Sequence, residues 1–254
     1  MNIVILGSTG VIGKALVKQY QKDNCIEASR KAVSPNIELD LSDFESILCF
    51  LKKLEHHKID ILFLNAATTR KEETKDHMEY SFMVNAFSMY YIAKHFTIYH
   101  KECRIVFTSS IRILHAKQKI QSKTISSAYR NTKLLAHLLL AHLQEEDPSA
   151  QIGFFHPGIV ASKLSLSLHH RWVQFLIRHF GNSLEHVVEG ALLAAEATKV
   201  KGNWVCPKGV FGLKGKPVLK KVNRSMVLDQ KVKQYVIEKE KELEKKYGIS
   251  CVRL

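Results

Sequence analysis

The pair of residues best suited to proton transfer in this sequence is Tyr129 and Lys133, four positions apart. They fall in a stretch, residues 128–143, whose apolar periodicity predicts a helix, so both side chains lie on one helix face. A free phenol has a pKa near about 10, and a lysine cation beside it lowers that pKa by favouring the phenolate. The spacing is common by chance, but it predicts an acid–base group suited to a carbonyl or hydroxyl oxygen.

Further polar residues occur where apolar segments end or are interrupted. A strand predicted at 104–108 ends in Ser109-Ser110, and a serine hydroxyl there can hydrogen-bond a carbonyl oxygen. Asn85 interrupts a long apolar helix predicted at 80–99. A buried amide needs hydrogen-bond partners, so a structural bridge is the alternative to a catalytic role.

A glycine-rich turn lies between the first predicted strand, 3–6, and the first predicted helix, 14–22. It consists of Gly7-Ser8-Thr9-Gly10-Val11-Ile12-Gly13. Glycines suit a sharp turn, a close backbone approach to a pyrophosphate and tight packing of the helix on the sheet. Exposed N–H groups at a helix start hold anions. The turn therefore predicts nucleotide binding, with a loop of incidental glycines as the alternative.

The residues after the second predicted strand, 25–28, indicate which dinucleotide binds. They are Ser29, Arg30 and Lys31. A basic residue here meets the 2′-phosphate of NADP, whereas an acidic residue would take the ribose hydroxyl of NAD. Arg30 offers a planar fork for phosphate and Lys31 adds charge, while Glu27 lies within the strand. The expected cofactor is NADP(H) ahead of NAD(H), with two ordinary surface cations as the alternative.

The elements that must position these residues alternate between short apolar strands and amphipathic helices. Strands are predicted at 3–6, 25–28, 37–39, 59–64, 104–108 and 152–155, and helices at 14–22, 44–54, 80–99, 128–143, 183–197 and 232–247. Strands that are apolar throughout indicate a parallel sheet covered on both faces. The expected fold class is α/β: a doubly wound parallel sheet of six or seven strands, the three-layer α/β/α Rossmann fold, with its ligand at the carboxyl ends of the strands.

The whole chain, 1–254, is expected to form one domain with two appendages. The apolar residues 164–180, within a segment of about 162–182, are expected to form a helical flap over an apolar pocket. A buried helix pair and a membrane-surface helix are the alternatives. A basic C-terminal extension is expected from about residue 216. Residues 199–224, which hold eight basic residues and no acidic one, are expected to form a solvated basic face. The helix at 232–247 is expected to dock on the body, to pair with another chain or to lie loose.

Composition limits the classes of function. The 254 residues carry 38 Lys and Arg against 24 Asp and Glu, a formal charge of +14 that favours anionic partners. No apolar run is long enough for a membrane span, and the N-terminus lacks the features of a secretory signal. Five cysteines without a C-x-x-C pair, and histidines without i, i+4 spacing, argue against a metal site and fit a cytoplasmic protein. Nucleic-acid binding is not expected, because the basic segment lacks interleaved aromatics and a known motif.

Taken together, these motifs resemble the short-chain dehydrogenase/reductase family, in its single-domain branch and nearest to retinol-dehydrogenase-like members. The resemblance covers about residues 1–215. It implies an NADP(H)-dependent interconversion of a carbonyl and an alcohol. It further implies that Ser110 holds the substrate oxygen, Tyr129 exchanges the proton and Asn85 organises a proton-relay water. Lys133 is implied to lower the tyrosine pKa and to bind the nicotinamide ribose.

The same resemblance implies the remaining cofactor contacts. These are Asp40 and Leu41 at the adenine, the motif Asn65, Ala66 and Ala67, and, under the nicotinamide, Pro157, Gly158, Ile159, Val160 and Ser162. The family forms homodimers or homotetramers through two helices, for which the Tyr129-bearing helix would serve. The apolar flap favours a lipophilic substrate, and contact with a membrane surface through the basic or apolar C-terminal segments is a further expectation.

The chain also departs from that family's pattern. Its glycines follow Gly-x-x-Gly-x-x-Gly, as in the extended and atypical branches, and Ala67 replaces a glycine of the motif. Eighteen residues separate Ser110 from Tyr129, which leaves Ser109 as the alternative catalytic serine. A non-catalytic NADP(H)-binding regulatory protein is the alternative function. An extended-branch sugar epimerase or dehydratase is disfavoured by the short tail after Gly158.

Overall fold

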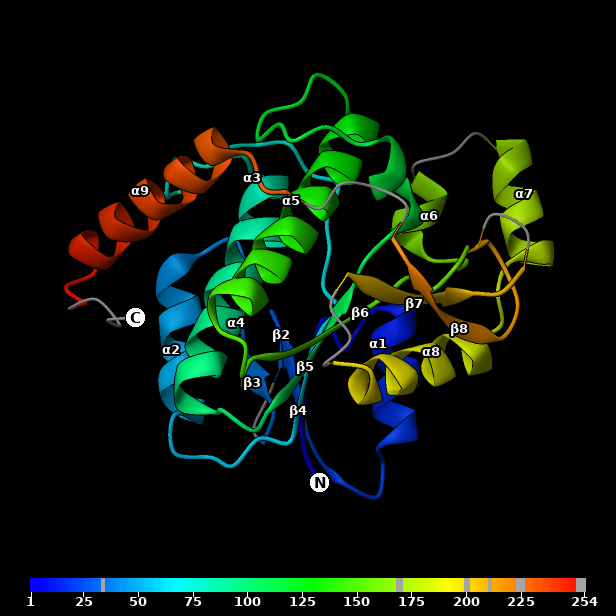
Figure 1. Cartoon of the computed structure of the whole chain (residues 1–254), viewed down its shortest axis with the longest axis horizontal. Coiled ribbons are helices and arrows are strands. Elements are labelled where there is room, and N and C mark those ends of the chain that lie inside the picture. Colours follow the sequence, from blue (N-terminus) through cyan, green and yellow to red (C-terminus); the bar gives the residue numbers. More distant parts are fainter. Residues whose placement is uncertain (33–34, 168–170, 199–201, 210–211, 223–226, 250–254) are drawn as a thin grey trace.

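The computed structural model describes all residues except 33–34, 168–170, 199–201, 210–211, 223–226 and 250–254 (Figure 1). The described residues form an eight-stranded sheet in the order β3-β2-β1-β4-β5-β6-β7-β8. Neighbouring strands are parallel except for β7 and β8, which are antiparallel. The strands are β1 (Asn2–Leu6), β2 (Asn24–Ser29), β3 (Ile37–Glu38), β4 (Ile61–Leu64), β5 (Arg104–Thr108), β6 (Gln151–Phe155), β7 (Asn203–Pro207) and β8 (Pro217–Lys221).

Strand β1 lies near the centre of the sheet because residues 3–6 are apolar and fully buried. Leu6 is opposite Ala28 of β2 on one side and opposite Leu64 of β4 on the other. The order of the strands reverses beside β1, so the carboxyl ends of β1, β4 and β5 meet at the switch point of a doubly wound sheet. Ligands bind at this point in such folds.

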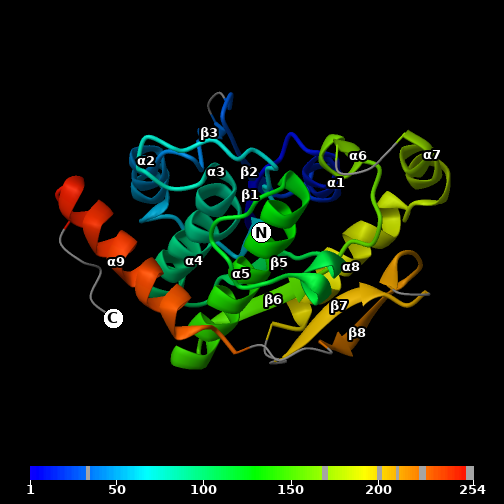
Figure 2. The same ribbon diagram turned by 90° about the horizontal axis from the view of Figure 1, so that it is seen from above.

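Helices cover both faces of the sheet, as Figure 2 shows from above. Helices α1 (Val11–Gln19) and α8 (Leu184–Glu196) pack on one face, and α2 (Phe44–Leu54), α4 (Ser88–Tyr99) and α5 (Ile125–Glu146) on the other. The three-layer Rossmann fold predicted from the sequence is confirmed. The sheet has more strands than expected because β7 and β8 fall in the basic region. The apolar run of β7 there is short, Trp204 to Cys206, and lysines follow the few apolar residues of β8.

The helix predicted at 80–99 is present but is not uniform. A short α3 (Tyr80–Phe82) passes through a π-helical turn, Met83–Phe87, into α4. The turn contains Asn85, which is fully buried. Single π-helical turns are frequently found at functional sites. The periodicity of apolar residues does not distinguish this wider turn from an ordinary helix.

After β6 the chain forms two short helices and, further along, the edge strand β8 of the sheet. Over its described residues the expected flap consists of α6 (Lys163–Ser167) and α7 (Arg171–Phe180). The extension expected from about residue 216 begins instead inside the sheet, because Pro217–Lys221 pairs with β7 as the edge strand β8. Lysines on an edge strand oppose pairing with another chain. No helix in the described part of the chain is long and apolar enough to cross a membrane.

The C-terminal helix α9 (Gln230–Lys246) docks on the helical layer, on the side of the molecule opposite the β7–β8 hairpin (Figures 1 and 2). Val232, Val236 and Leu243 are buried in the same core as α4 and α5. Lys94 of α4 donates to Glu240 of α9 at 2.7 Å, and both side chains are buried. Of the three arrangements expected for this helix, docking on the body is the one observed.

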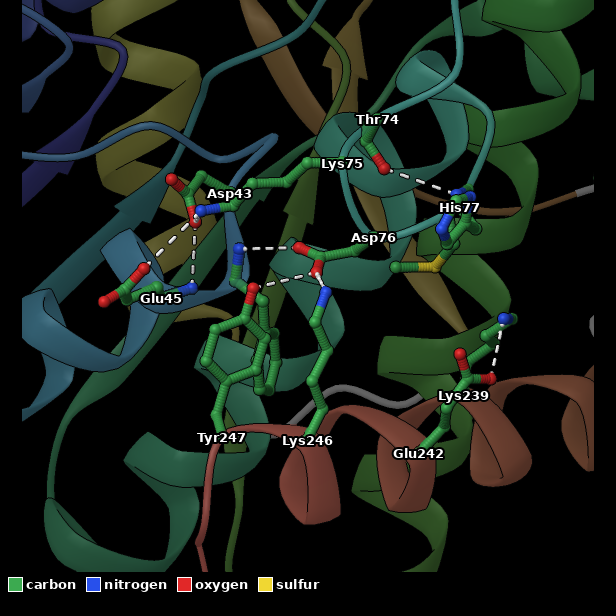
Figure 3. A network of polar contacts seen from close by, with 12 residues as sticks. Asp43, Glu45, Thr74, Lys75, Asp76, His77, Lys239, Glu242, Lys246 and Tyr247 are labelled. Carbon is green, nitrogen blue, oxygen red and sulfur yellow. Dashed lines mark hydrogen bonds and ion pairs between the residues drawn. The ribbon is translucent and has the colours of Figure 1, made fainter.

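A buried carboxylate fastens the end of α9 to the loop after β4 (Figure 3). Asp76 accepts hydrogen bonds from Lys246 Nζ at 2.7 Å and Tyr247 Oη at 2.9 Å, and from the Phe44 backbone N–H at 3.2 Å. Burial alone would raise the pKa of Asp76, but these hydrogen bonds, that of Lys246 foremost, hold it below its ordinary value. The carboxylate thereby joins the start of α2, the end of α9 and the loop that leads to the site.

Candidate active site

A pocket of about 1050 Å³ opens at the carboxyl edge of the sheet and collects most of the predicted site residues. On its wall are Gly7, Thr9, Gly10, Val11, Ile12, Ser29, Arg30, Asp40, Leu41, Asn65, Ala66, Ala67, Ser110, Tyr129, Lys133, Pro157, Gly158, Ile159, Val160 and Ser162. Residues that are far apart in the sequence therefore line one cavity. Four predicted residues, Ser8, Gly13, Lys31 and Asn85, are not on the wall.

Close packing explains two of the glycines in the turn. Gly7 has a φ of +75°, and a Cβ there would lie 2.8 Å from the Cα of Ala66. A Cβ on Gly13 would lie 2.2 Å from the carbonyl oxygen of Gly7. Gly13 therefore lets α1 pack directly on the turn, and does not itself face the pocket. Val11 and Ile12, at the start of α1, do face the pocket, and a helix start offers free N–H groups to an anion.

Ser8 and Lys31 are also absent from the pocket wall. Ser8 is buried, and within the described residues its hydroxyl has no hydrogen-bond partner. Lys31 is exposed in the turn one residue beyond Arg30, outside the pocket. Lys14, which the sequence did not single out, adds a second cation to Arg30 on this part of the wall. The part of the pocket beside the glycine turn, here called the nucleotide-binding end, therefore carries two cations, Lys14 and Arg30.

Lys133 is held in the interior at the acid–base end of the pocket. Its side chain is 1 % exposed, and Nζ donates to the carbonyl oxygen of Thr108 at 2.6 Å. The same nitrogen lies 4.5 Å from the centroid of the Phe107 ring. Burial lowers the pKa of Lys133 to about 7. A proton on this amine is therefore only weakly held at neutral pH.

Tyr129 lies on the same wall, and its phenol is within hydrogen-bonding reach of Ser110. Burial raises the pKa of Tyr129 above its ordinary value, and the hydrogen bond from Ser110 and the charge of Arg112 act against this. The sequence-based expectation named Lys133 as the cation that lowers this pKa. In the structure, the charge that lowers the pKa of Tyr129 is that of Arg112. Lys133 Nζ is hydrogen-bonded to the Thr108 carbonyl, and the role implied for Lys133 stays a prediction.

The two adjacent serines have different partners. Ser109 Oγ lies 2.9 Å from Nδ1 of His137, which is fully buried on α5. Burial, together with the nearby Lys133, lowers the pKa of His137 to about 3, so the imidazole is neutral. Ser110 Oγ instead faces Tyr129 and accepts from the backbone N–H of Arg112 at 3.3 Å. This geometry favours Ser110 over Ser109 as the serine that meets a substrate.

Asn85 supports the site from behind the wall. Its Oδ1 accepts from the backbone N–H of Thr68 at 2.7 Å, and its Nδ2 donates to the Thr68 carbonyl at 2.9 Å and to Thr132 Oγ1 at 3.0 Å. Thr68 is on the wall, and Thr132 precedes Lys133 on α5. The amide therefore ties the loop after β4 to the helix that carries the tyrosine and lysine.

Several wall residues were not predicted. The interval between Ser110 and Tyr129 begins with a 3-10 helix, Ile111–His115, which brings Ile111 and Arg112 to the pocket. Arg70, in the loop after β4, and Tyr80, at the start of α3, also line the pocket, with the guanidinium 4.2 Å from the ring centroid. No motif identifies these residues, because only the fold brings them to the pocket. In the described part of the chain, no cluster of potential metal ligands is found.

The fold and this pocket are of the short-chain dehydrogenase/reductase type, so the resemblance to that family is confirmed. The single-domain, retinol-dehydrogenase-like branch stays a prediction. The model of the NAD dependent epimerase/dehydratase family matches residues 3–180, and the chain belongs to this family. None of the curated protein sequences compared with the chain matches it.

Solved structures with similar folds include several dehydrogenases. An uncharacterised protein from Mycobacterium Paratuberculosis has a TM-score of 0.67 at 19% identity, covering 96% of this chain and 93% of that one. The 3-alpha-hydroxysteroid dehydrogenase from Pseudomonas sp. B-0831, complexed with NADH, has a TM-score of 0.62 at 16% identity, with coverages of 79% and 92%. An alcohol dehydrogenase from Thermococcus sibiricus, complexed with 5-hydroxy-NADP, has a TM-score of 0.51 at 20% identity, with coverages of 65% and 79%. At these identities the likeness is one of fold.

Proposed function

We propose that the protein is an NADP(H)-dependent oxidoreductase that interconverts a carbonyl and an alcohol. The observation that supports this most strongly is that one pocket joins the glycine turn and Arg30 to Ser110, Tyr129 and Lys133. A nucleotide-binding end and an acid–base end are then continuous, as hydride transfer between a dinucleotide and a substrate requires.

The residues of the pocket fit a phosphorylated dinucleotide. The N–H groups at the start of α1 suit a pyrophosphate, and in the same turn the buried Ser8 hydroxyl lacks a partner among the described residues. Arg30 suits a 2′-phosphate, and Asp40 and Leu41 line the part of the wall expected to hold the adenine. When bound, NADPH supplies the hydride. Structural relatives hold both NADP-type and NADH ligands, which keeps NAD(H) as the alternative cofactor.

The acid–base residues suit the reductive direction. Because burial raises its pKa, Tyr129 is a protonated phenol at neutral pH and is suited to donate a proton to a carbonyl oxygen. Ser110, which already reaches the phenol, would hold the same oxygen. Lys133 lines the pocket beside them and would bind the nicotinamide ribose. Asn85 is a positioning residue, because it acts through Thr68 and Thr132.

The wall beyond Tyr129 favours a substrate with an apolar body. Ile111, Leu164, Ile177 and Leu213 line it, so two of the four apolar side chains come from α6 and α7. The predicted flap thus contributes to the same cavity as the predicted catalytic residues. Contact of this region with a membrane surface stays a prediction.

The test is NADPH oxidation with a panel of hydrophobic ketones and aldehydes. We expect Tyr129→Phe to lower the turnover rate at least ~100-fold, the usual scale for a positioned acid, while NADPH affinity is unchanged. Tyr99→Phe is the matched control, because Tyr99 is exposed at the end of α4 and is not on the pocket wall. Full activity of Tyr129→Phe would remove the tyrosine from the mechanism.

Two alternative outcomes are informative. Tight NADPH binding without turnover on any of the panel would favour a non-catalytic regulatory protein. The name of the matching family model supports the other candidate, an NAD-dependent epimerase or dehydratase acting on a sugar. Conversion of a nucleotide sugar by the protein would establish that candidate.

A further inference from the structure

Arg112 lies beside the phenol that the proposed reaction uses. It belongs to the 3-10 helix Ile111–His115 and lines the pocket. Its Nη2 donates to Ser126 Oγ at 2.7 Å, and Ser126 stands three residues before Tyr129 on α5. Side chains on a helix lean toward its N-terminus, so Tyr129 leans over the turn that contains Ser126. The guanidinium is thereby fixed next to the acid–base end of the pocket.

This guanidinium lacks a counter-ion. Among the residues that the structure describes, its side chain has the Ser126 hydroxyl as a partner but no carboxylate, and the buried Nη1 has no hydrogen-bond partner. Leaving a partly buried charge unpaired is costly, and such groups in proteins are normally matched by an opposite charge. The charge on Arg112 is therefore available to a ligand.

The other charged residues on the wall are either satisfied or lie toward the nucleotide-binding end. Lys133, at the acid–base end, donates to the Thr108 carbonyl. Arg70 is paired with Glu72 and also donates to Tyr80 Oη at 3.2 Å. Lys14 and Arg30 lie beside the glycine turn and the end of β2. Asp40 is the one carboxylate among the described wall residues, and it accepts hydrogen bonds from Ser42 at the end of β3. No negative charge on the wall faces Arg112.

We propose that Arg112 binds a carboxylate of the substrate, so that the enzyme acts on apolar oxo acids or hydroxy acids in preference to neutral ketones or alcohols. This inference rests on the proposed function and names its substrate class. The carboxylate lies close to the reacting carbon, because the guanidinium is beside Tyr129 and Ser110. The remainder of the substrate contacts the apolar wall. A planar guanidinium suits this role because it binds a carboxylate through two parallel hydrogen bonds.

The experiment compares matched acids and esters as substrates. The probes are phenylglyoxylate, 2-oxooctanoate and 4-oxo-4-phenylbutanoate, each with its methyl ester, and the reaction is followed by NADPH oxidation. We expect kcat/KM of the wild type to favour at least one acid over its ester about 10- to 100-fold, the effect of one charge-assisted pair. Because Arg112 also acts on the Tyr129 phenol, Arg112→Gln should slow both substrates, but it should lower kcat/KM for that acid about 10-fold or more beyond the loss for its ester. Arg112→Lys should retain part of the preference for the acid.

Lys119→Gln is the matched control. It removes the same charge from the same interval of the chain, but Lys119 is exposed and is not on the wall. Thermal unfolding of each variant shows whether it is folded. An equal loss for acids and esters in Arg112→Gln, with a changed pH profile, would mean that the guanidinium acts only on the Tyr129 phenol, and would overturn the carboxylate site. A wild type that prefers the esters would overturn it as well.

A binding measurement separates this proposal from the reductase function. The same acids are titrated calorimetrically into protein saturated with NADP⁺. A 10-fold or greater loss of affinity in Arg112→Gln, in a protein that turns over neither acids nor esters, would support the carboxylate site and reject the reductase. Reduction of the esters at full rate, with no effect of Arg112→Gln on any titration, would keep the reductase and reject the carboxylate site.

Discussion

Replacing Lys133 by methionine should stabilise the protein while removing turnover. The lysine is 1 % exposed, and burial lowers its pKa from 10.5 to about 7. One pKa unit corresponds to about 1.4 kcal/mol, so holding the charged amine in the fold costs about 5 kcal/mol well below pH 7 and about 4 kcal/mol at pH 7. Methionine has a similar length and no charge. Allowing about 1 kcal/mol for the lost hydrogen bond to Thr108, we expect a net gain of about 3 kcal/mol at pH 7.

The gain should fall as the pH rises. An unfolded lysine keeps its proton up to about pH 10, whereas the folded one loses it near pH 7, so between these values the unfolded state binds more protons. Wild-type stability therefore rises with pH over this range. The cost of the buried amine falls to about 2 kcal/mol at pH 9, so the advantage of the methionine variant should shrink by about 2 kcal/mol between pH 7 and 9. Urea unfolding followed by circular dichroism at both pH values measures it.

Lys94→Met is the matched control for this prediction. Lys94 is also buried, but it is paired with Glu240 at 2.7 Å. Its removal leaves a buried carboxylate without a counter-ion, which should cost about 3 kcal/mol. If Lys133→Met were instead less stable than the wild type at pH 7, or if the difference did not change with pH, the amine would be charged and well accommodated in the fold, and the reasoning would be refuted.

Three further predictions concern the pocket. Gly13→Ala should lower the free energy of unfolding by about 2 kcal/mol or more, because the added Cβ would lie 2.2 Å from the Gly7 carbonyl oxygen. A Cβ added at Gly10 would lie 3.4 Å from that oxygen, so Gly10→Ala should unfold at the same urea concentration as the wild type. Ser110→Ala should lower kcat about 100-fold, whereas Ser109→Ala should lose only its hydrogen bond to His137, with about 1 kcal/mol less stability and little change in activity. Equal effects of the two variants on kcat would contradict the assignment of Ser110. Arg30→Ala should weaken NADPH binding about 10-fold or more without changing NADH binding, and unchanged titrations with both would exclude Arg30 as the phosphate ligand.

The sheet and the nucleotide-binding turn could be predicted because local rules determine them. Apolar strands followed at once by glycine, asparagine or serine have few other arrangements, and the carboxyl ends of parallel strands necessarily meet at one edge. The edge strand β8 was missed because Lys220 and Lys221 follow its few apolar residues. The π-helical turn around Asn85 was missed because apolar periodicity does not record a wider turn.

The electrostatics of the site could not be predicted from motif spacing. The four-residue interval between Tyr129 and Lys133 places them on one helix face, but it does not show that Lys133 is directed to Thr108 or how deeply it is buried. The role of Arg112 depends on how the long interval after Ser110 folds back onto α5. Such contacts are properties of the tertiary structure, and so are the pKa changes that burial causes.

The docked helix α9 limits which surface of the protein is open to a second copy of the chain. It covers the outer side of α4 and α5 with apolar residues and places Glu240 against Lys94. The sequence resemblance predicts a homo-oligomer that forms through two such helices. A second molecule on this side would have to displace α9, which is held there by the Lys94–Glu240 ion pair and by apolar contacts. Helix α9 therefore occupies the surface on which the predicted helix-to-helix dimer would form.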